Sequence, residues 1–251
     1  GYHPRQAIDF WKAESKEPTP VYLYIHGGGW QGGDKKSMNR GVVKQCLAKG
    51  ISVAAINYRY VRQAVQLKIK PPVKEWNLDK KRIGATGGSA GGCSSLWLAL
   101  HDDLADPKSD DPVARESTRL YCAAVNGAQT TLDPKPLLEW MPNYRYGAHA
   151  FGLRSIQDLS RNREKLMDWI NEYSPMSHVS KDDPPIAMFY GGPKNPKKGD
   201  KPGDTTHSAQ LGMILAEKLN EAREETILVY PGNPHPKYRS SAQFLIERLK
   251  K

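Results

Sequence analysis

Apolar and polar residues along this chain follow two alternating spacings, which predict strands and helices in turn. Short apolar runs of the kind that form buried strands occupy residues 5–11, 22–25, 51–57, 82–86, 121–126, 186–190 and 226–230. Apolar residues recur every three or four positions, the spacing of one face of a helix, in segments 38–47, 93–104, 211–219 and 244–249. Strands that alternate with helices predict an α/β fold, with a mostly parallel sheet flanked by helices on both faces.

Two intervals depart from this alternation. Residues 132–171 carry several aromatic side chains but show no regular strand–helix pattern. Between Tyr60 and Lys81, Pro71 and Pro72 interrupt the chain, and no amphipathic helix is evident. A crossover between parallel strands usually contains a helix of its own. We therefore expect a segment of the natural protein to be absent near Pro72–Lys74.

Length and composition favour one folded unit without a nucleic-acid partner and without a membrane span. The 251 residues suit a single domain over 1–251 with a sizeable core. The net charge is +10, but the lysines are dispersed, and their one cluster, at 194–201, is broken by Pro and Gly. Nucleic-acid binding requires a basic stripe or an aromatic stacking platform, and neither is evident. No apolar stretch approaches the roughly 18–20 residues of a membrane span.

Neither the cysteines nor the start of the chain indicates a catalytic or metal-binding role. Cys46, Cys93 and Cys122 fit no metal-binding spacing and lie in predicted apolar helices or strands, so we expect buried free thiols. The chain begins at Gly1 without a leader. We expect a fragment that would lack any export signal, so a secreted or periplasmic location is compatible with it and the compartment stays unassigned.

The sequence Gly87-Gly88-Ser89-Ala90-Gly91 provides the first candidate for catalysis. It lies between a predicted strand and a predicted helix, and the spacing G-x-S-x-G fits the sharp turn called a nucleophile elbow. Glycine tolerates the unusual backbone angles of this turn. We therefore expect the Ser89 hydroxyl to be presented above the sheet.

A glycine-rich loop follows the strand at 22–25 and reads His26-Gly27-Gly28-Gly29-Trp30. Consecutive glycines leave backbone N–H groups free to point at an anion. Together with Gly33-Asp34-Lys35, Asn57-Tyr58-Arg59 and the GGSAGG elbow, this loop resembles the α/β-hydrolase esterases with an HGGG loop. The resemblance is closest to the bacterial carboxylesterases that include acetyl-xylan and feruloyl esterases, and it covers nearly the whole chain.

This resemblance implies a site and a reaction. The N–H groups of Gly28, Gly29 and Ala90 would form an oxyanion hole, and residues 132–171 would form an insert over the active site. Trp30 and Tyr58 would line or border the substrate pocket. The implied activity is hydrolysis of small to medium carboxylic esters, such as acetyl or feruloyl esters of polysaccharide, through an acyl-enzyme. This chemistry needs no metal or cofactor.

The base and the acid of a catalytic triad remain to be chosen. In α/β-hydrolases the order is serine, acid, histidine, and His235 is the one histidine after the last predicted strand. Its segment, Tyr230-Pro231-Gly232-Asn233-Pro234-His235, also resembles the family's Y-P-G-x-x-H ending. The acid must follow the strand at 186–190. Asp204 is favoured over Asp200, because one helix and one strand fit between Asp204 and His235.

Two other classes of function remain open at this point. One is a serine peptidase or amidase on the same fold, although the HGGGW loop favours esters. The other is a catalytically inactive binding module, although the serine and the histidine are both retained. The particular ester and the oligomeric state are not specified by the sequence.

Overall fold

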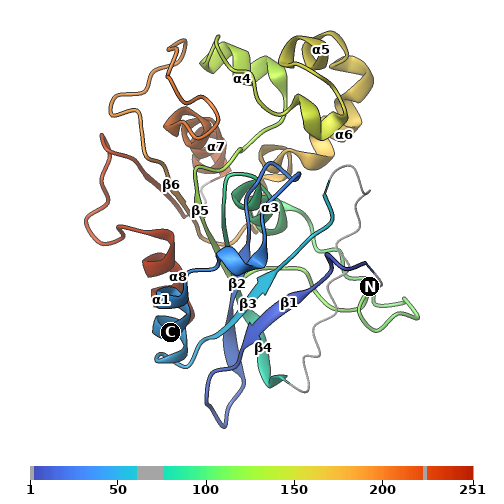
Figure 1. The fold of residues 1–251 in the computed structure, drawn as a ribbon, viewed down its shortest axis with the longest axis vertical. Helices are drawn as coiled ribbons and strands as arrows, with labels where there is room; N and C mark the ends of the chain where they lie inside the picture. The colour runs from blue at the N-terminus through green and yellow to red at the C-terminus, as the bar shows by residue number, and fades with distance from the viewer. Residues whose placement is uncertain (1–2, 61–75, 223–224, 251) are drawn as a thin grey trace.

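The structure, a computed structural model, describes residues 3–60, 76–222 and 225–250. Within these residues, seven strands form one sheet with the order β1-β3-β2-β4-β5-β6-β7 (Figure 1). The strands are β1 (Ile8–Trp11), β2 (Thr19–Ile25), β3 (Ser52–Ile56), β4 (Leu78–Gly88), β5 (Cys122–Asn126), β6 (Ile186–Phe189) and β7 (Thr226–Val229). Only β1 is antiparallel to its neighbour in this sheet. The predicted mostly parallel sheet is therefore confirmed.

Helices follow the strands largely where the apolar spacing predicts them. They are α1 (Arg40–Leu47), α3 (Ala90–Leu100), α7 (Ala209–Ala222) and α8 (Ser241–Lys250). The prediction that the elbow helix continues to Leu104 is wrong. His101 has an extended ψ of 145°, which ends α3, and Leu104 is 52% exposed.

The core lies on both faces of the sheet, as the alternation of side chains in a strand requires. Ala123 and Val125 of β5 pack on the face covered by α3 and α7. Cys122 and Ala124 point to the opposite face, where α1 and α8 pack. All three cysteines are buried free thiols, as predicted.

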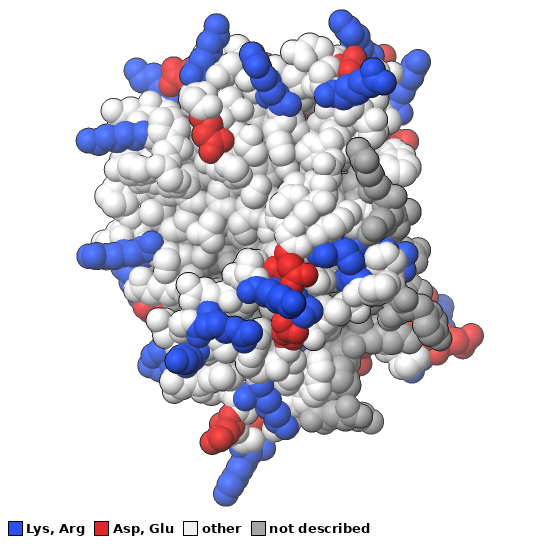
Figure 2. All heavy atoms as spheres, viewed as in Figure 1, with Lys and Arg blue, Asp and Glu red and all other residues white. Residues whose placement is uncertain are grey.

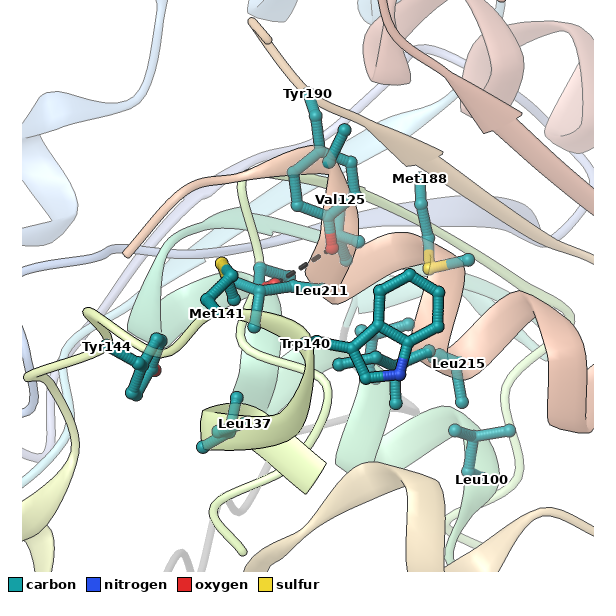
Figure 3. Packing of buried hydrophobic residues seen from close by; sticks show 14 of the residues in the cluster. Leu100, Val125, Leu137, Trp140, Met141, Tyr144, Met188, Tyr190, Leu211 and Leu215 are labelled. Carbon is teal, nitrogen blue, oxygen red and sulfur yellow. Dashed lines mark hydrogen bonds between the residues drawn. The ribbon is translucent and has the colours of Figure 1, made fainter. Parts of the chain in front are cut away.

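The insert, residues 132–171, packs on the first of these faces. Its helices are α4 (Pro134–Trp140), α5 (Ile156–Arg161) and α6 (Met167–Tyr173), the last of which extends two residues beyond it. The 3₁₀ turns among the described residues are at Lys35–Ser37, Ala148–Phe151, Glu164–Leu166 and Pro175–His178. Leu137 and Trp140 of α4 share one buried cluster with Met188 of β6 and Leu215 of α7 (Figure 3). These contacts fix the insert to the body of the fold.

Strand direction decides where loops can meet. Because β2, β4, β5 and β6 are parallel neighbours, their carboxyl ends lie at one edge of the sheet. At this edge lie the glycine-rich loop after β2, Ser89 after β4, Asn126 at the end of β5 with Gly127 after it, and residues 190–208 after β6. Ligand sites of open α/β sheets form at such an edge.

On the face shown in Figure 2, Lys and Arg side chains are scattered along the upper and left edges and across the lower half, several beside Asp or Glu, and the upper middle is mostly uncharged. No helix among the described residues is long and apolar enough to span a membrane. The segment predicted to be missing near Pro72–Lys74 lies outside the described residues.

Candidate active site

Ser89 occupies a sharp turn between β4 and α3, and this turn requires glycine at nearby positions. Its φ is +52°, and its N–H donates to the Asn126 carbonyl at 2.9 Å. A Cβ at Gly87 would lie 2.4 Å from the Gly91 carbonyl carbon, and a Cβ at Gly91 would lie 2.1 Å from the Ile25 oxygen. The glycines of the motif therefore allow β4, α3 and the end of β2 to approach closely and hold Ser89 in a nucleophile-elbow geometry.

The imidazole that contacts Ser89 belongs to His207. His207 Nε2 lies 3.1 Å from Ser89 Oγ, and His207 Nδ1 lies 2.9 Å from Asp204 Oδ2. A carboxylate can only accept a hydrogen bond, so Nδ1 carries the proton and Nε2 is free to accept from the serine hydroxyl. This is the arrangement that a nucleophile, a base and an orienting acid require.

Local turn geometry and one tertiary contact hold His207 in place. Asp204 Oδ1 accepts from the backbone N–H groups of Thr206 at 2.9 Å and His207 at 3.1 Å. Gln129 Nε2 donates to the Thr206 carbonyl at 2.7 Å, which ties this turn to the segment after β5. Gly127 provides the space, because a Cβ there would lie 3.1 Å from the His207 Cβ.

The charge of Asp204 is favoured by its partners. Partial desolvation raises the pKa of Asp204, but hydrogen bonds from the His207 side chain and from the His207 and Thr206 N–H groups lower it more. The net direction is downward, so Asp204 stays a carboxylate under mildly acidic conditions. Asp200, the alternative acid, instead accepts from the Lys197 N–H at 2.8 Å within its own loop.

The contacts with Ser89 and Asp204, hereafter the relay, are both made by His207. Among the described residues His235, the predicted base, makes no hydrogen bond to either of them, and this assignment is corrected. Its Nδ1 accepts from the N–H groups of Lys237 at 3.2 Å and Tyr238 at 3.0 Å. A neutral imidazole with Nδ1 as acceptor carries its proton on Nε2, and that nitrogen cannot take a proton from serine. The ring also stacks on Tyr238, with centroids 5.2 Å apart. In this geometry His235 caps the turn before α8.

Sequence reasoning missed His207 because it required the histidine to follow the last predicted strand, where the Y-P-G-x-x-H ending pointed to His235. One local signal was present, since Asp204 and His207 lie three residues apart at the mouth of a predicted helix. The signal that decides the matter is tertiary, because Ser89 and His207 are 118 positions apart.

The glycine-rich loop presents unused donors near Ser89. Gly28 and Gly29 have φ values of +106° and +60°, a region that favours glycine. The Gly28 carbonyl accepts from the N–H groups of Gln31 and Gly32. Among the hydrogen bonds of the described residues, none uses the N–H groups of Gly28, Gly29 or Ala90. These donors are available to a ligand.

Tyr58 supports this loop through His26, and its predicted place at the substrate pocket stays a prediction. Its side chain is buried, and its hydroxyl donates to the His26 carbonyl at 2.9 Å. Its ring stacks on His26, with centroids 4.3 Å apart. Arg5 holds His26 from the other side, with 3.2 Å between Nη2 and Nε2. These contacts assign Tyr58 a role in holding the glycine-rich loop.

Trp30 lies between the loop and the insert. Its indole N–H donates to Ser94 Oγ at 3.3 Å, and its ring centroid is 6.2 Å from that of His149. His149 Nε2 is 3.0 Å from the Gly29 carbonyl oxygen, so the insert contacts the glycine-rich loop directly. Trp30 is half-buried, and its predicted contact with substrate stays a prediction.

A depression of about 730 Å³ lies beside the segment that follows β5, although Ser89, Asp204 and His207 do not themselves line it. Its lining includes Asn126 and Gly127, which contact Ser89 and His207 respectively, and extends to Tyr190, Tyr230, His235 and Arg239. His235 therefore lies in the wall of this depression. Its size suits a small or medium ligand.

The parallel sheet, the serine elbow and the relay at the carboxyl edge define the α/β-hydrolase class. Solved structures agree on this fold. An acetyl ester-xyloside bifunctional hydrolase from Caldicellulosiruptor lactoaceticus has a TM-score of 0.63 at 21% identity, covering 91% of this chain and 77% of that one. The propionate-bound esterase 2 of Thermogutta terrifontis also has a TM-score of 0.63 at 21% identity, covering 97% of this chain and 85% of that one. The predicted fold is thus confirmed.

The chain belongs to the BD-FAE family, whose model matches residues 8–196. It is 27% identical over 208 residues to the probable carboxylic ester hydrolase LipM of Mycobacterium tuberculosis, covering 73% of this chain and 44% of LipM. It is 22% identical over 216 residues to esterase LipC of the same organism, covering 76% of this chain and 49% of LipC. The chain therefore spans about half the length of these relatives. The resemblance inferred from the motifs is confirmed.

Proposed function

We propose that this protein is a serine carboxylesterase in which Ser89 is the nucleophile, His207 the base and Asp204 the orienting acid. The observation that carries the proposal is the continuous relay from Ser89 Oγ through His207, with separations of 3.1 Å and 2.9 Å. Both lie within the hydrogen-bonding reach that proton transfer requires. The family membership and the esterase names of the relatives support the same reaction.

In the first half-reaction, His207 Nε2 takes the Ser89 proton while Ser89 Oγ forms a bond to the ester carbonyl carbon. The carbonyl oxygen becomes an oxyanion, which the N–H groups of Gly28, Gly29 and Ala90 stabilise. Loss of one such donor typically costs about 3–4 kcal/mol of transition-state stabilisation. The bond from the carbonyl carbon to the alkoxy oxygen then breaks, and His207 gives its proton to the leaving alcohol.

In the second half-reaction, water attacks the acyl-enzyme with His207 as base. The bond between the acyl carbon and Ser89 Oγ breaks, the carboxylic acid leaves, and the proton returns to Ser89. Throughout, the Asp204 carboxylate keeps the Nδ1 proton of His207 in place. Its lowered pKa supports this role, because a neutral carboxyl group would not stabilise the imidazolium.

The substrate class that we favour is a short acyl ester, with acetyl groups on polysaccharide as the first candidate. Two structurally similar proteins, an acetyl ester-xyloside bifunctional hydrolase and a carbohydrate esterase from gut microbiota, bear names of this kind. The open depression lined by Asn126 and Gly127 can accept an ester attached to a larger polymer.

Hydrolysis of p-nitrophenyl acetate by Ser89→Ala, His207→Gln and His235→Gln proteins tests the assignment. We expect the first two to lose at least about 1,000-fold in kcat, whereas His235→Gln should keep a rate close to wild type. A fluorophosphonate probe should label the wild type and fail to label Ser89→Ala. Acetylated xylan, methyl ferulate and an aminoacyl p-nitroanilide, compared on the wild type, then separate acetyl esterase, feruloyl esterase and amidase.

Three results would contradict the assignment of the base, of enzyme activity or of the reaction. If His235→Gln abolishes turnover while His207→Gln retains it, the base assignment is wrong and His235 is the base. If the probe does not label Ser89 and none of the esters is hydrolysed, the enzyme assignment itself is wrong. Faster cleavage of the nitroanilide than of the esters would replace the esterase with an amidase.

A further inference from the structure

We propose that His101, Glu172 and His178 form a site for one divalent transition-metal ion, with Zn²⁺ as the ion of choice. The three side chains come from the end of α3, from α6 and from the 3₁₀ turn at Pro175–His178. Their ligand atoms all lie within 4.8 Å of one another. Two imidazoles and one carboxylate are a ligand set that zinc uses in proteins, with water in the fourth position.

The spacing of these groups suits an ion between them. His101 Nε2 and Glu172 Oε1 are 3.7 Å apart, too far for a direct hydrogen bond. Two ligand atoms that each lie about 2.1 Å from zinc are about 3.4 Å apart in a tetrahedral site. Small rotations of the half-buried His101 and the exposed Glu172 side chains would reduce their separation from 3.7 Å to about 3.4 Å.

Both imidazoles are already oriented by backbone carbonyls. His101 Nδ1 lies 2.9 Å from the Asp102 carbonyl oxygen, and His178 Nε2 lies 2.7 Å from the Glu172 carbonyl oxygen. A carbonyl only accepts, so each of these nitrogens carries a proton. In the neutral imidazole, the opposite nitrogen of each ring is the one that can bind a metal. Hydrogen bonding of the second ring nitrogen is the usual way in which proteins orient metal-binding histidines.

The surroundings are compatible with a cation. Glu172 and His178 line a surface depression together with Asp168 and Lys218. The two carboxylates outnumber the one ammonium, and Lys218 Nζ donates to the Met176 carbonyl at 2.9 Å. The rings of His101 and His178 also pack closely, with centroids 4.5 Å apart. Two protonated imidazoles would repel at this distance, whereas a shared metal would bind both in neutral form.

The site would connect two parts of the fold that matter for the active site. His101 immediately follows α3, whose first turn begins at Ser89, and Glu172 lies in α6 next to the insert. The indole N–H of Trp97 in α3 already donates to the Glu172 carbonyl at 2.6 Å. A bound ion would add a second connection between these helices, and it should therefore stabilise the folded state.

Isothermal titration of untagged, EDTA-dialysed protein with ZnCl₂ tests the proposal. We expect one zinc ion per chain in the wild type, and a loss of at least about tenfold in affinity in His101→Ala and in His178→Ala. Glu164→Gln is the matched control, since it removes an exposed carboxylate of the insert that lies outside the cluster. Zinc should raise the melting temperature of the wild type and of Glu164→Gln, and this increase should be lost in His101→Ala.

Cobalt substitution supplies a spectroscopic signature of the bound metal, measured on variants whose circular dichroism matches that of the wild type. Co²⁺ bound by this trio should give visible absorption bands in the wild type and in His207→Gln, and not in His178→Ala. The proposal is overturned if the wild type binds no zinc, or if His101→Ala and His178→Ala bind it as the wild type does. Loss of the metal in His207→Gln alone would place the ion at the relay instead. None of these results depends on ester hydrolysis, so the two proposals fail independently.

Discussion

Replacement of Gly127 by Ala should displace the His207 imidazole, although Ser89, His207 and Asp204 all keep their own side chains. Gly127 has a φ of +52°, and an added Cβ would lie 3.1 Å from His207 Cβ, 3.3 Å from Cδ2 and 3.4 Å from Cγ. These contacts require the imidazole to shift by a few tenths of an ångström. A side chain in the left-handed region also costs about 1–2 kcal/mol of conformational energy.

The two effects predict separate magnitudes. A misplacement of about 1 Å can cost about 100-fold in rate, so a shift of a few tenths should lower kcat by about 3- to 30-fold. The strain should lower the melting temperature by about 2–8 °C, because 1 kcal/mol corresponds to about 2–4 °C in a chain of this size. Steady-state hydrolysis of p-nitrophenyl acetate and thermal unfolding measure the two quantities.

Gly50→Ala provides the matched control. Gly50 follows α1 with a φ of +70°, and an added Cβ there would meet no atom within 4 Å. We expect a similar loss of melting temperature in this variant, with kcat unchanged. Equal kcat values for Gly127→Ala and Gly50→Ala would refute the reasoning that Gly127 provides the space for His207.

Three further predictions follow from the geometry. His149→Ala removes the contact with the Gly29 carbonyl and should lower kcat by about 2- to 10-fold, since one hydrogen bond contributes about 0.5–1.5 kcal/mol; an unchanged kcat would show that the insert does not order the loop. Tyr58→Phe should reduce the free energy of unfolding by about 1 kcal/mol, because it removes the bond to the His26 carbonyl; a change in KM with unchanged stability would place Tyr58 at the substrate pocket instead. The pKa of Asp204 is lowered, so its stabilising contribution is present above its unfolded pKa of about 3.9 and is lost as pH falls through the lower folded value. Urea unfolding between pH 2 and 6 should therefore show a shallower acid-side decline in Asp204→Asn, and identical slopes would contradict this.

Much of the fold could be predicted because its signals are local. The apolar runs at Tyr22–Ile25 and at 186–190, and the period of three to four at 211–219, each reflect burial of one face of one element. The nucleophile elbow could also be predicted from the sequence. The close approach of β4 and α3 requires glycine at positions 87 and 91, independently of the rest of the fold. Element ends were less accurate, as the end of α3 at Leu100 shows, since hydrophobic spacing alone does not mark where a helix stops.

The sequence by itself determined the α/β architecture, the serine elbow and the glycine-rich loop, because each rests on residues adjacent in the chain. Only the tertiary structure decided which of seven histidines faces Ser89. Sheet order brings the segments after β4, β5 and β6 to one edge, where Gly127 makes room for His207 and Asn126 holds the Ser89 N–H. The same packing directs the Tyr58 hydroxyl to the His26 carbonyl and lets His235 Nδ1 accept hydrogen bonds within a turn. The physical reason is that a proton relay depends on distances across the sheet, and spacing along the chain does not encode them.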